Sequence, residues 1–399
     1  SHLARAVDLQ QHGAISTMGR GPGSHSMRTA GVSAVIAVEL LWPSPLAYAK
    51  LASAGSIIGA YGNWGQCDEQ MMQVAADGAN VLFWFALTLK SVEGQPAMST
   101  NLDLDCVANI TKTLRAQGTT TTHLISVGGW CGRHPETAWS GARWFAVFDA
   151  WNRRLTGTGA PLFDGFDWDV EGCTQKSKVS LEVLNLMGEM SLAAKAAGYA
   201  VTMAPAQSYL DVDTSEFNLM LNNTPAVPWQ PSFHYHGRNT YAYLLAQFGA
   251  DTFDLVSVQL YESWSPAHYA ITNQSTPIED YISSWLAVFS SGWLVNFSSI
   301  GLPPARVSLH PSQLLVGMHI PFPGMPSKVL GLRPEHLKSA WARLADAGQG
   351  RTPRGVMFWC VACGDSRGLT RELNSFLQVR SSPASVKASA DISTDILYP

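Results

Sequence analysis

Charged side chains are scarce in this chain. Asp, Glu, Lys and Arg make up only 14% of its 399 residues, whereas apolar residues make up 46%. Such a balance can fill a large core and argues against an intrinsically disordered protein. The formal net charge is −4, and no basic run with interleaved aromatic residues occurs. We therefore do not expect nucleic acid as a partner.

Residues 1–50 show little of the patterning of the rest of the chain. Their apolar run, Gly31–Val38, is too short to span a membrane. It lies between the basic Arg28 and the small-residue segment Ala47–Ala49, which is the layout of a secretory signal, although Glu39 interrupts it. An amphipathic helix against the folded domain is the alternative. We expect a disordered or signal-like segment over residues 1–50, a secreted protein and no membrane span.

Cysteine is rare but even in number. The six residues are Cys67, Cys106, Cys131, Cys173, Cys360 and Cys363. In a secreted protein an even count suggests disulfides, and free thiols are one alternative. Zinc is another, because Cys360-x-x-Cys363 is half of a ligand set, yet no second pair follows at a suitable spacing. Four sequons would permit glycosylation on a secretory route: Asn109, Asn222, Asn273 and Asn296.

Short β-rich runs alternate with longer stretches that can hold helices. The runs are Ile57–Tyr61, Asn80–Leu87, His123–Gly129, Gly165–Glu171, Ala200–Ala204, Leu255–Tyr261, Leu314–Met318 and Gly355–Trp359. Near-continuous apolar runs are typical of parallel strands that are buried on both faces. Eight such units predict a single (β/α)₈ barrel over residues 51–379, with its site at the C-terminal ends of the strands. A doubly wound sheet is the alternative, and the Ser- and Ala-rich tail, residues 380–399, is expected to be disordered.

Tryptophan, by contrast, is abundant, with 14 residues. Several follow predicted strands, among them Trp64, Trp130 and Trp359. Indole rings stack on the flat apolar C–H faces of sugars, so these positions favour a carbohydrate site. Packing between the barrel and its helices is the alternative for any one of them.

The fourth predicted strand carries three carboxyl groups at alternate positions. Because residues two apart share a face of a strand, Asp167, Asp169 and Glu171 point into the barrel, while the apolar residues between them point to the helices. Like charges at this spacing resist ionising together, so at least one pKa must rise, as a general acid requires. Glu171 comes last and is nearest the mouth. An acidic edge strand facing water and a calcium site are the alternatives.

The acidic strand resembles the signature of a known family. The run Asp164-Gly165-x-Asp167-x-Asp169-x-Glu171 resembles the DGxDxDxE signature of glycoside hydrolase family 18, which includes chitinases, endo-β-N-acetylglucosaminidases and inactive lectins. Further segments resemble the family's motifs in the same order: Ser126–Gly129, Met203–Pro205, Gln259–Tyr261 and Gly355–Trp359. The resemblance covers residues 57 to 365.

The resemblance implies a mechanism in which the substrate's own 2-acetamido group is the nucleophile. Glu171 would protonate the leaving oxygen, Asp169 would hold the acetamido N–H, Asp167 would tune its charge, and Tyr261 would donate to the acetamido carbonyl. The substrate-binding residues would be Tyr61, Trp359, Gln259, Met203 and Trp130. No metal and no cofactor is implied.

The chain departs from the family's pattern in places. Glu262 follows Tyr261, where the family usually has Asn or Asp, and this puts a substrate hydrogen bond in doubt. The placing of Gln207 after the fifth strand is uncertain by one residue. On the implied barrel, neighbouring top loops predict a disulfide between Cys131 and Cys173. They also predict one between Cys67 and either Cys360 or Cys363.

The leading hypothesis is therefore a chitinase that cleaves β-1,4-linked N-acetylglucosamine in chitin or its oligomers. An endo-β-N-acetylglucosaminidase acting on N-glycans is one alternative. Only 36 residues lie between Met318 and Gly355, too few for the extra α+β domain that deepens the groove in some relatives. A chitin-binding lectin without turnover is the other alternative, although such relatives usually replace the residue equivalent to Glu171.

Overall fold

The computed structural model describes residues 51, 55–173, 179–221, 229, 237–262, 265–320, 329–346 and 352–381. The expectations for residues 1–50 and for the tail beyond 381 lie outside these ranges. Eight parallel strands form the centre: β1 (Ile57–Tyr61), β2 (Val81–Val92), β4 (Thr122–Gly129), β5 (Gly165–Val170), β6 (Ala200–Met203), β7 (Leu255–Gln259), β10 (Leu314–His319) and β11 (Gly355–Trp359). Each overlaps one of the eight predicted runs, although β2 continues to Val92, beyond the predicted end at Leu87.

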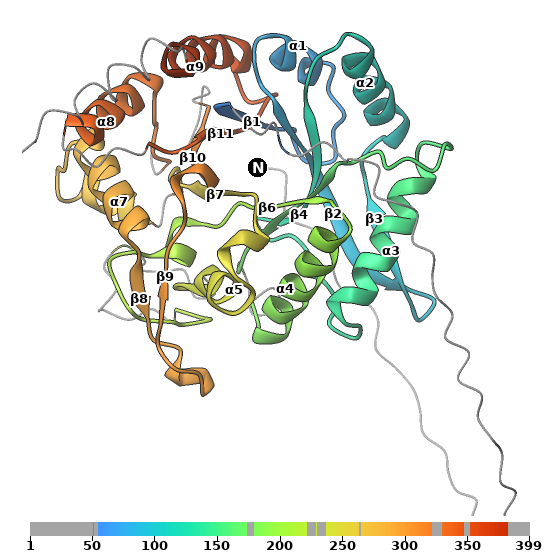
Figure 1. Ribbon diagram of the computed structural model, residues 1–399, viewed down its shortest axis with the longest axis horizontal. Coiled ribbons are helices and arrows are strands. Elements are labelled where there is room, and N and C mark those ends of the chain that lie inside the picture. Colours follow the sequence, from blue (N-terminus) through green and yellow to red (C-terminus); the bar gives the residue numbers. More distant parts are fainter. Residues whose placement is uncertain are drawn as a thin grey trace, which may run out of the picture. The chain divides into compact units, whose positions relative to one another are not determined.

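The sheet closes on itself. The strands follow one another in chain order, and β1 pairs with β2 on one side and with β11 on the other (Figure 1). Ile57 pairs with Gly355, while Gly59 pairs with Val81. Closure excludes the doubly wound alternative and confirms a (β/α)₈ barrel.

Helices surround the barrel (Figure 1). They are α1 (Gln70–Ala76), α2 (Leu104–Ala116), α3 (Gly141–Arg154), α4 (Leu181–Ala196), α5 (Thr240–Phe248), α6 (Pro266–Thr272), α7 (Ile278–Ser291), α8 (Pro334–Asp346) and α9 (Ser366–Ser381). Three strands were not predicted: β3 (Gln95–Thr100), antiparallel to the outer half of β2, and the hairpin of β8 (Trp293–Val295) and β9 (Ala305–Val307). The predicted tail begins at residue 380, inside the last turn of α9.

Several helices begin at a side chain that satisfies a free backbone N–H. The Ser140 hydroxyl accepts from the Arg143 N–H at the start of α3, and the Ser180 hydroxyl accepts from the Val183 N–H at the start of α4. Asp103 does the same for α2. Such caps each contribute about 1 kcal/mol, and here they fix where the helices begin above the strand ends.

Side chains alternate between two cores. The inner core fills the barrel with residues from successive strands: Ile57, Tyr61, Val81, Phe83, Phe85, Leu124, Ala200, Ala204, Leu255, Leu315 and Met357. The intervening residues, such as Trp84, Trp168 and Val201, belong to a larger core between strands and helices. Burial of each large apolar side chain contributes roughly 1.5–3 kcal/mol, so strand alternation decides which residues can face the barrel interior.

All six cysteines form disulfides. The predicted bond between Cys131 and Cys173 is present. The prediction for Cys67 was wrong, because its partner is Cys106 on α2, while Cys360 and Cys363 pair with each other. The three-residue separation lets that last pair close within one turn, in which the Cys363 N–H donates to the Cys360 carbonyl. Paired sulfurs are not zinc ligands, so the zinc alternative is excluded.

Among the helices of the described ranges, none has the length and apolarity needed to cross a bilayer. Of the sequon asparagines, Asn109, Asn273 and Asn296 are exposed. Asn222 lies outside the described residues.

Candidate active site

The three carboxyl groups lie where strand alternation places them. Asp167 is fully buried inside the barrel, and Asp169 and Glu171 are 6% and 3% exposed. Glu171 comes directly after β5 ends at Val170, at the C-terminal mouth. Phe166 belongs to the outer core, as predicted for the outward face. A water-facing edge strand is therefore excluded.

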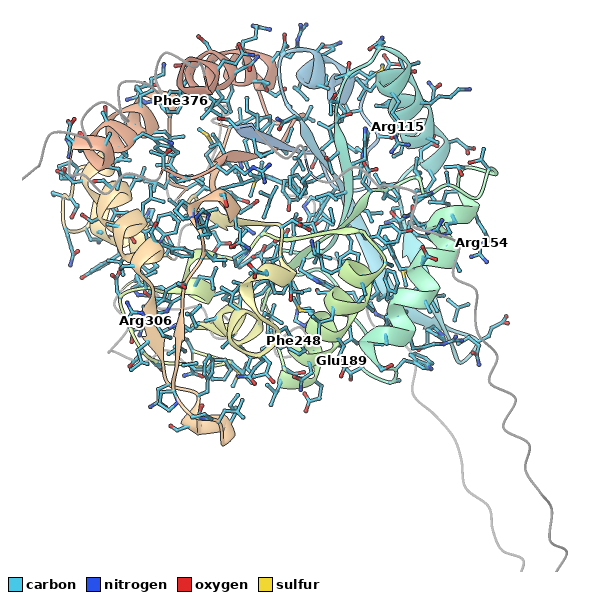
Figure 2. The ribbon with its side chains drawn as sticks, viewed as in Figure 1. Arg115, Arg154, Glu189, Phe248, Arg306 and Phe376 are labelled. Carbon is cyan, nitrogen blue, oxygen red and sulfur yellow. A yellow bond between two sulfur atoms is a disulfide. The ribbon has the colours of Figure 1, made fainter. Side chains whose placement is uncertain are left out.

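The first aspartate of the motif has a different place. Asp164 lies at the N-terminal end of β5, where it accepts from the His123 backbone N–H at 2.8 Å and from Arg115 at 3.1 Å. Arg115 lies on α2 at the edge of the barrel (Figure 2). Burial raises the pKa of Asp164 in spite of these two donors. Asp164 thus ties β5 to β4 and α2, and it is not part of the carboxyl group cluster at the mouth.

Asp167 is surrounded by hydroxyl donors. Ser126 and Thr202 are its register partners on β4 and β6, and their hydroxyls donate to it at 2.8 and 2.5 Å. The Tyr61 hydroxyl donates from β1 at 2.5 Å. Burial raises the pKa of Asp167, and the three hydroxyls offset only part of this effect. The three hydroxyl donors favour the ionised form of Asp167, which lies one inward position before Asp169 on β5.

Asp169 and Glu171 influence each other's titration. Burial is the largest cause that raises the pKa of each, and the charge of Glu171 raises the pKa of Asp169 further. Two carboxyl groups can hydrogen-bond each other only when one of them is protonated. The Gln259 amide lies between them and donates at 2.8 Å to Asp169 and at 3.3 Å to Glu171. The two groups titrate together, and their mutual hydrogen bond raises the pKa of Asp169 and lowers that of Glu171, while burial raises both.

Glu262 is a third member of this group. Burial and the negative charge of Glu171 raise the pKa of Glu262 well above its ordinary value. The Glu171 Oε2 atom is buried and receives no N–H or hydroxyl hydrogen bond from the described residues. Sequence comparison marked Glu262 only as a departure from the family's pattern, and its contact with Glu171 became visible from the structure.

Tyr261 lies near the carboxyl groups, and its ring contacts His319. Burial and the nearby carboxylates, Asp169 first, raise the pKa of Tyr261 well above its ordinary value, so its hydroxyl remains a donor. Its ring meets His319 edge to face at 5.6 Å between centroids. Sequence analysis missed His319, although it occupies the next inward position of β10 after Leu315 and Gly317. Period-two counting from Leu315 would have found it.

An aromatic floor lies beside Tyr61. Trp359 has its ring centroid 5.9 Å from that of Tyr61, 5.2 Å from Phe85 and 6.4 Å from Trp64. Trp64 and Trp130 are 45% and 40% exposed, more than most tryptophans of the chain. They follow the ends of β1 and β4 and offer exposed indole rings at the mouth.

Glycine is required where the floor meets the carboxyl strand. Gly128 has φ +109°, and a Cβ there would lie 2.5 Å from the Asp169 carbonyl oxygen. A Cβ on Gly129 would lie 2.1 Å from the Phe85 ring. Side chains at these positions would displace the strand that carries Asp169 or the floor itself.

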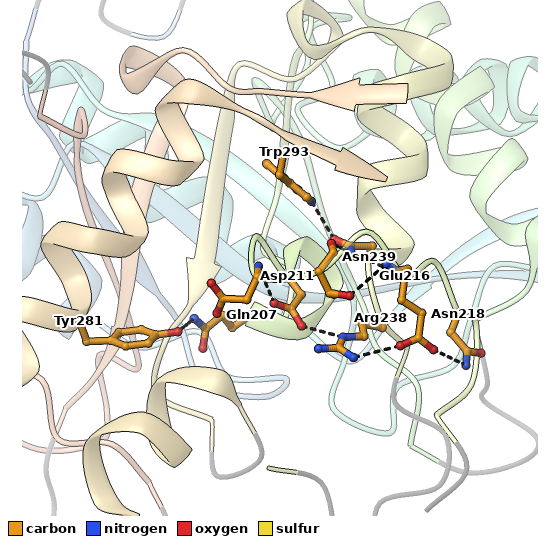
Figure 3. Close-up of polar contacts among 10 residues, drawn as sticks. Gln207, Asp211, Glu216, Asn218, Arg238, Asn239, Tyr281 and Trp293 are labelled. Carbon is orange, nitrogen blue, oxygen red and sulfur yellow. Dashed lines mark hydrogen bonds and ion pairs between the residues drawn. The ribbon is translucent and has the colours of Figure 1, made fainter. Parts of the chain in front are cut away.

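The structure does not bring Met203 to this group. Met203 is fully buried in the outer core, because the inward positions of β6 are Ala200, Thr202 and Ala204. Gln207 is also committed elsewhere: its amide donates to the Tyr281 hydroxyl at 2.6 Å and accepts from a backbone N–H of α6 at 2.9 Å (Figure 3).

A polar network holds the loop that follows Gln207 (Figure 3). Arg238 donates to Asp211 at 2.7 Å and to Glu216 at 3.0 Å. Asn239 donates to the Glu216 carbonyl at 2.8 Å and accepts from Trp293 at 3.2 Å. These contacts join segments far apart in the chain and hold the loop after Gln207 in place.

Comparisons with known proteins bear on the fold. No family model and no curated protein matches the chain. The chain is similar in structure to a family GH18 chitinase from Chromobacterium violaceum, with 16% identity and a TM-score of 0.55 over 82% of this chain and 83% of the other. It is also similar to the C-terminal domain of ChiA from Legionella pneumophila, with 17% identity and a TM-score of 0.56 over 80% of this chain and 98% of the other. At this level of identity the likeness is one of fold: this barrel is built like those of solved GH18 chitinases.

Proposed function

We propose that this protein is a chitinase that cleaves β-1,4 linkages between N-acetylglucosamine units with retention of configuration. The observation that carries the proposal is the buried Asp169–Glu171 pair at the mouth of the barrel, where burial raises the pKa of both carboxyl groups. A general acid must hold its proton at working pH, and burial beside a second carboxyl group supplies that condition.

The proposed catalytic cycle gives these groups the roles that the resemblance to family 18 implies. Glu171 delivers a proton to the glycosidic oxygen as the bond to the anomeric carbon breaks. The substrate's acetamido oxygen forms a bond to the same carbon and gives an oxazolinium ion. Asp169, ionised at this stage, stabilises the positive charge of that ion, and Asp167 lies beneath Asp169 on the same strand. Tyr261 donates to the acetamido carbonyl. Water then attacks the anomeric carbon, the bond between that carbon and the acetamido oxygen breaks, and Glu171 takes the proton of the water. The acetamido group and the starting configuration are thereby restored.

The aromatic residues define where sugars would bind. Trp359 offers a ring beside Tyr61, and Trp64 and Trp130 are exposed after the ends of β1 and β4. Several indoles at the mouth suit a polymer of sugars with flat apolar faces. We therefore favour chitin and its oligomers over a branched glycan as the substrate.

The protein is proposed to act outside the cell. Three disulfides link the loops of the barrel, and such bonds persist in oxidising compartments. The signal-like segment within residues 1–50 and the exposed sequons are compatible with this route.

Glu171→Gln tests the proposal directly. Wild-type protein should shorten chitin hexamers, and the variant should lose roughly 10²- to 10⁴-fold in rate, because the amide cannot donate the required proton. Products would be read by mass, and melting temperature should stay close to wild type. Full activity in the variant would overturn the assignment of the acid.

A second substrate separates the alternatives. A high-mannose glycoprotein, incubated in parallel, would lose its glycans if the protein is an endo-β-N-acetylglucosaminidase. Cleavage of neither substrate, together with tight binding of the hexamer, would support a lectin.

A further inference from the structure

The peptide that carries Glu171 lies beyond the paired part of its strand. Pairing of β5 with β6 ends at Trp168, opposite Met203, and pairing with β4 ends at Val170, opposite Gly129. The backbone groups that follow need other partners, because buried N–H and C=O groups without hydrogen bonds are costly.

Three side chains supply these partners. The Tyr241 hydroxyl accepts from the Val170 N–H at 2.9 Å and donates to the Val170 carbonyl at 3.1 Å. The Tyr209 hydroxyl accepts from the Gly172 N–H at 2.7 Å. Both tyrosines are fully buried, and burial raises the pKa of each, so both hydroxyls stay protonated.

His134 holds the remaining group, the main-chain carbonyl of Glu171 itself. Its Nε2 atom lies 2.8 Å from this oxygen. A carbonyl oxygen can only accept, so Nε2 carries the hydrogen and donates it. Four backbone groups next to or on Glu171 are thus held by side chains from three parts of the chain: α5, the turn after β6, and the loop after β4.

The His134 loop is joined covalently to the segment that it holds. Cys131, three residues before His134, forms a disulfide with Cys173, two residues after Glu171. The same loop turns back on the end of β4, where the Gly132 N–H donates to the Gly129 carbonyl at 2.8 Å. The disulfide brings the two loops together, and the His134 hydrogen bond fixes the orientation of the peptide within that link.

We propose that His134 is a positioning residue, which acts through the main chain of Glu171 to aim the acid at the scissile bond. This inference rests on the proposed function. The carboxyl group of Glu171 is connected to this peptide only through the rotatable bonds of its own side chain. A shift of the peptide therefore moves the acid relative to Asp169, which is held within β5, and relative to Gln259 at the end of β7, whose amide donates to both carboxyl groups.

His134→Ala, His134→Gln and Arg133→Ala test the inference. The glutamine amide can donate to the same carbonyl, whereas alanine cannot. Arg133 is the matched control, since it is exposed on the same loop and pairs with Glu136 rather than with Glu171. On chitin hexamer, His134→Ala should lower kcat roughly 10- to 100-fold with little change in KM, because small misplacements of a catalytic group cost rate. His134→Gln should recover most of kcat, and Arg133→Ala should match wild type.

A role limited to loop stability would give a different pattern. It would lower the melting temperature of His134→Ala and leave kcat of the folded protein unchanged, and that result would overturn the proposal. Equal loss of kcat in the Gln and Ala variants would also overturn it.

Amide hydrogen exchange separates this inference from the proposed function. If wild-type protein cleaves no chitin oligomer, the proposed function fails. The effect of His134 on the backbone hydrogen bonds around Glu171 can still be measured by amide exchange. His134→Ala should then speed exchange of the Gly172 amide roughly tenfold relative to wild type and to His134→Gln. Unchanged exchange in all three proteins would contradict the positioning role.

Discussion

Glu262 shows how one side chain can adjust the catalytic proton. The hydrogen bond between the Glu262 and Glu171 side chains lowers the pKa of Glu171, which burial otherwise raises. Burial, the charge of Glu171 and this hydrogen bond together raise the pKa of Glu262, which favours Glu262 as the donor. The pair therefore limits how far the pKa of the acid rises.

The pH dependence of activity should report this contact. Glu262→Ala removes the donor, so the pKa of Glu171 should rise and the alkaline limb of kcat/KM should move to higher pH. Glu262→Gln retains an N–H donor and should stay closer to wild type. A shift of the alkaline limb to lower pH in Glu262→Ala would contradict this assignment.

His123 links stability to pH from within the outer core. Its Nδ1 accepts from the Trp84 indole N–H at 3.3 Å, so Nε2 carries the hydrogen and faces the Thr121 hydroxyl at 2.9 Å. The ring is thus held neutral, and burial lowers the pKa of His123 from 6.5 to about 3. Between these values the unfolded chain binds a proton that the folded protein does not.

Stability should consequently fall as the pH is lowered through this window. His123 should contribute a loss of up to about 1.4 kcal/mol per pH unit below pH 6.5, and no effect above it. The measurement is the free energy of unfolding in denaturant between pH 4 and 7, for wild type and for His123→Gln. Equal slopes in the two proteins would refute the contribution, and if the variant does not fold, NMR titration of the His123 ring gives the same answer.

At the scale of elements, two disulfides span almost equal lengths of chain. Cys131–Cys173 joins residues 42 apart, and Cys67–Cys106 joins residues 39 apart. In the chain-entropy description each should stabilise the fold by a similar amount, roughly 2–5 kcal/mol. Only the first lies beside Glu171.

Replacing each pair by serine should therefore separate stability from positioning. Both double variants should lose similar amounts of thermal stability, but Cys131→Ser/Cys173→Ser should lose much more kcat on chitin hexamer. The assay is run well below both melting temperatures. Equal kcat values in the two variants would argue that this disulfide contributes only to stability.

Most barrel strands could be predicted because they are near-continuous apolar runs buried on both faces, whereas β5 was recognised by its alternation of apolar and acidic residues. The strand β3 was missed because Gln95–Thr100 is partly exposed and lacks such a run. The partner of Cys67 was also missed. Its bond depends on how α2 presents Cys106 to the loop after β1, and strand order alone does not specify that contact.

At the scale of the whole molecule, closure of the barrel collects residues that lie far apart in the chain. Tyr61, Asp167 and Trp359 come from β1, β5 and β11 and meet within one pocket. Strand periodicity predicted the inward carboxyl groups. It could not predict the His134 contact, because that residue lies in a loop, where no period constrains the direction of a side chain.

The requirement for an acetamido group tests the central claim most directly. Rates of cleavage are measured on chitin hexamer and on cellulose hexamer, which have the same linkage but differ at the 2-position, and the anomer first released is read by NMR. If Asp169 and Glu171 act with the substrate's own acetamido oxygen, only chitin hexamer should be cleaved, and the β-anomer should appear first. Rapid cleavage of cellulose hexamer, or first release of the α-anomer, would contradict the account.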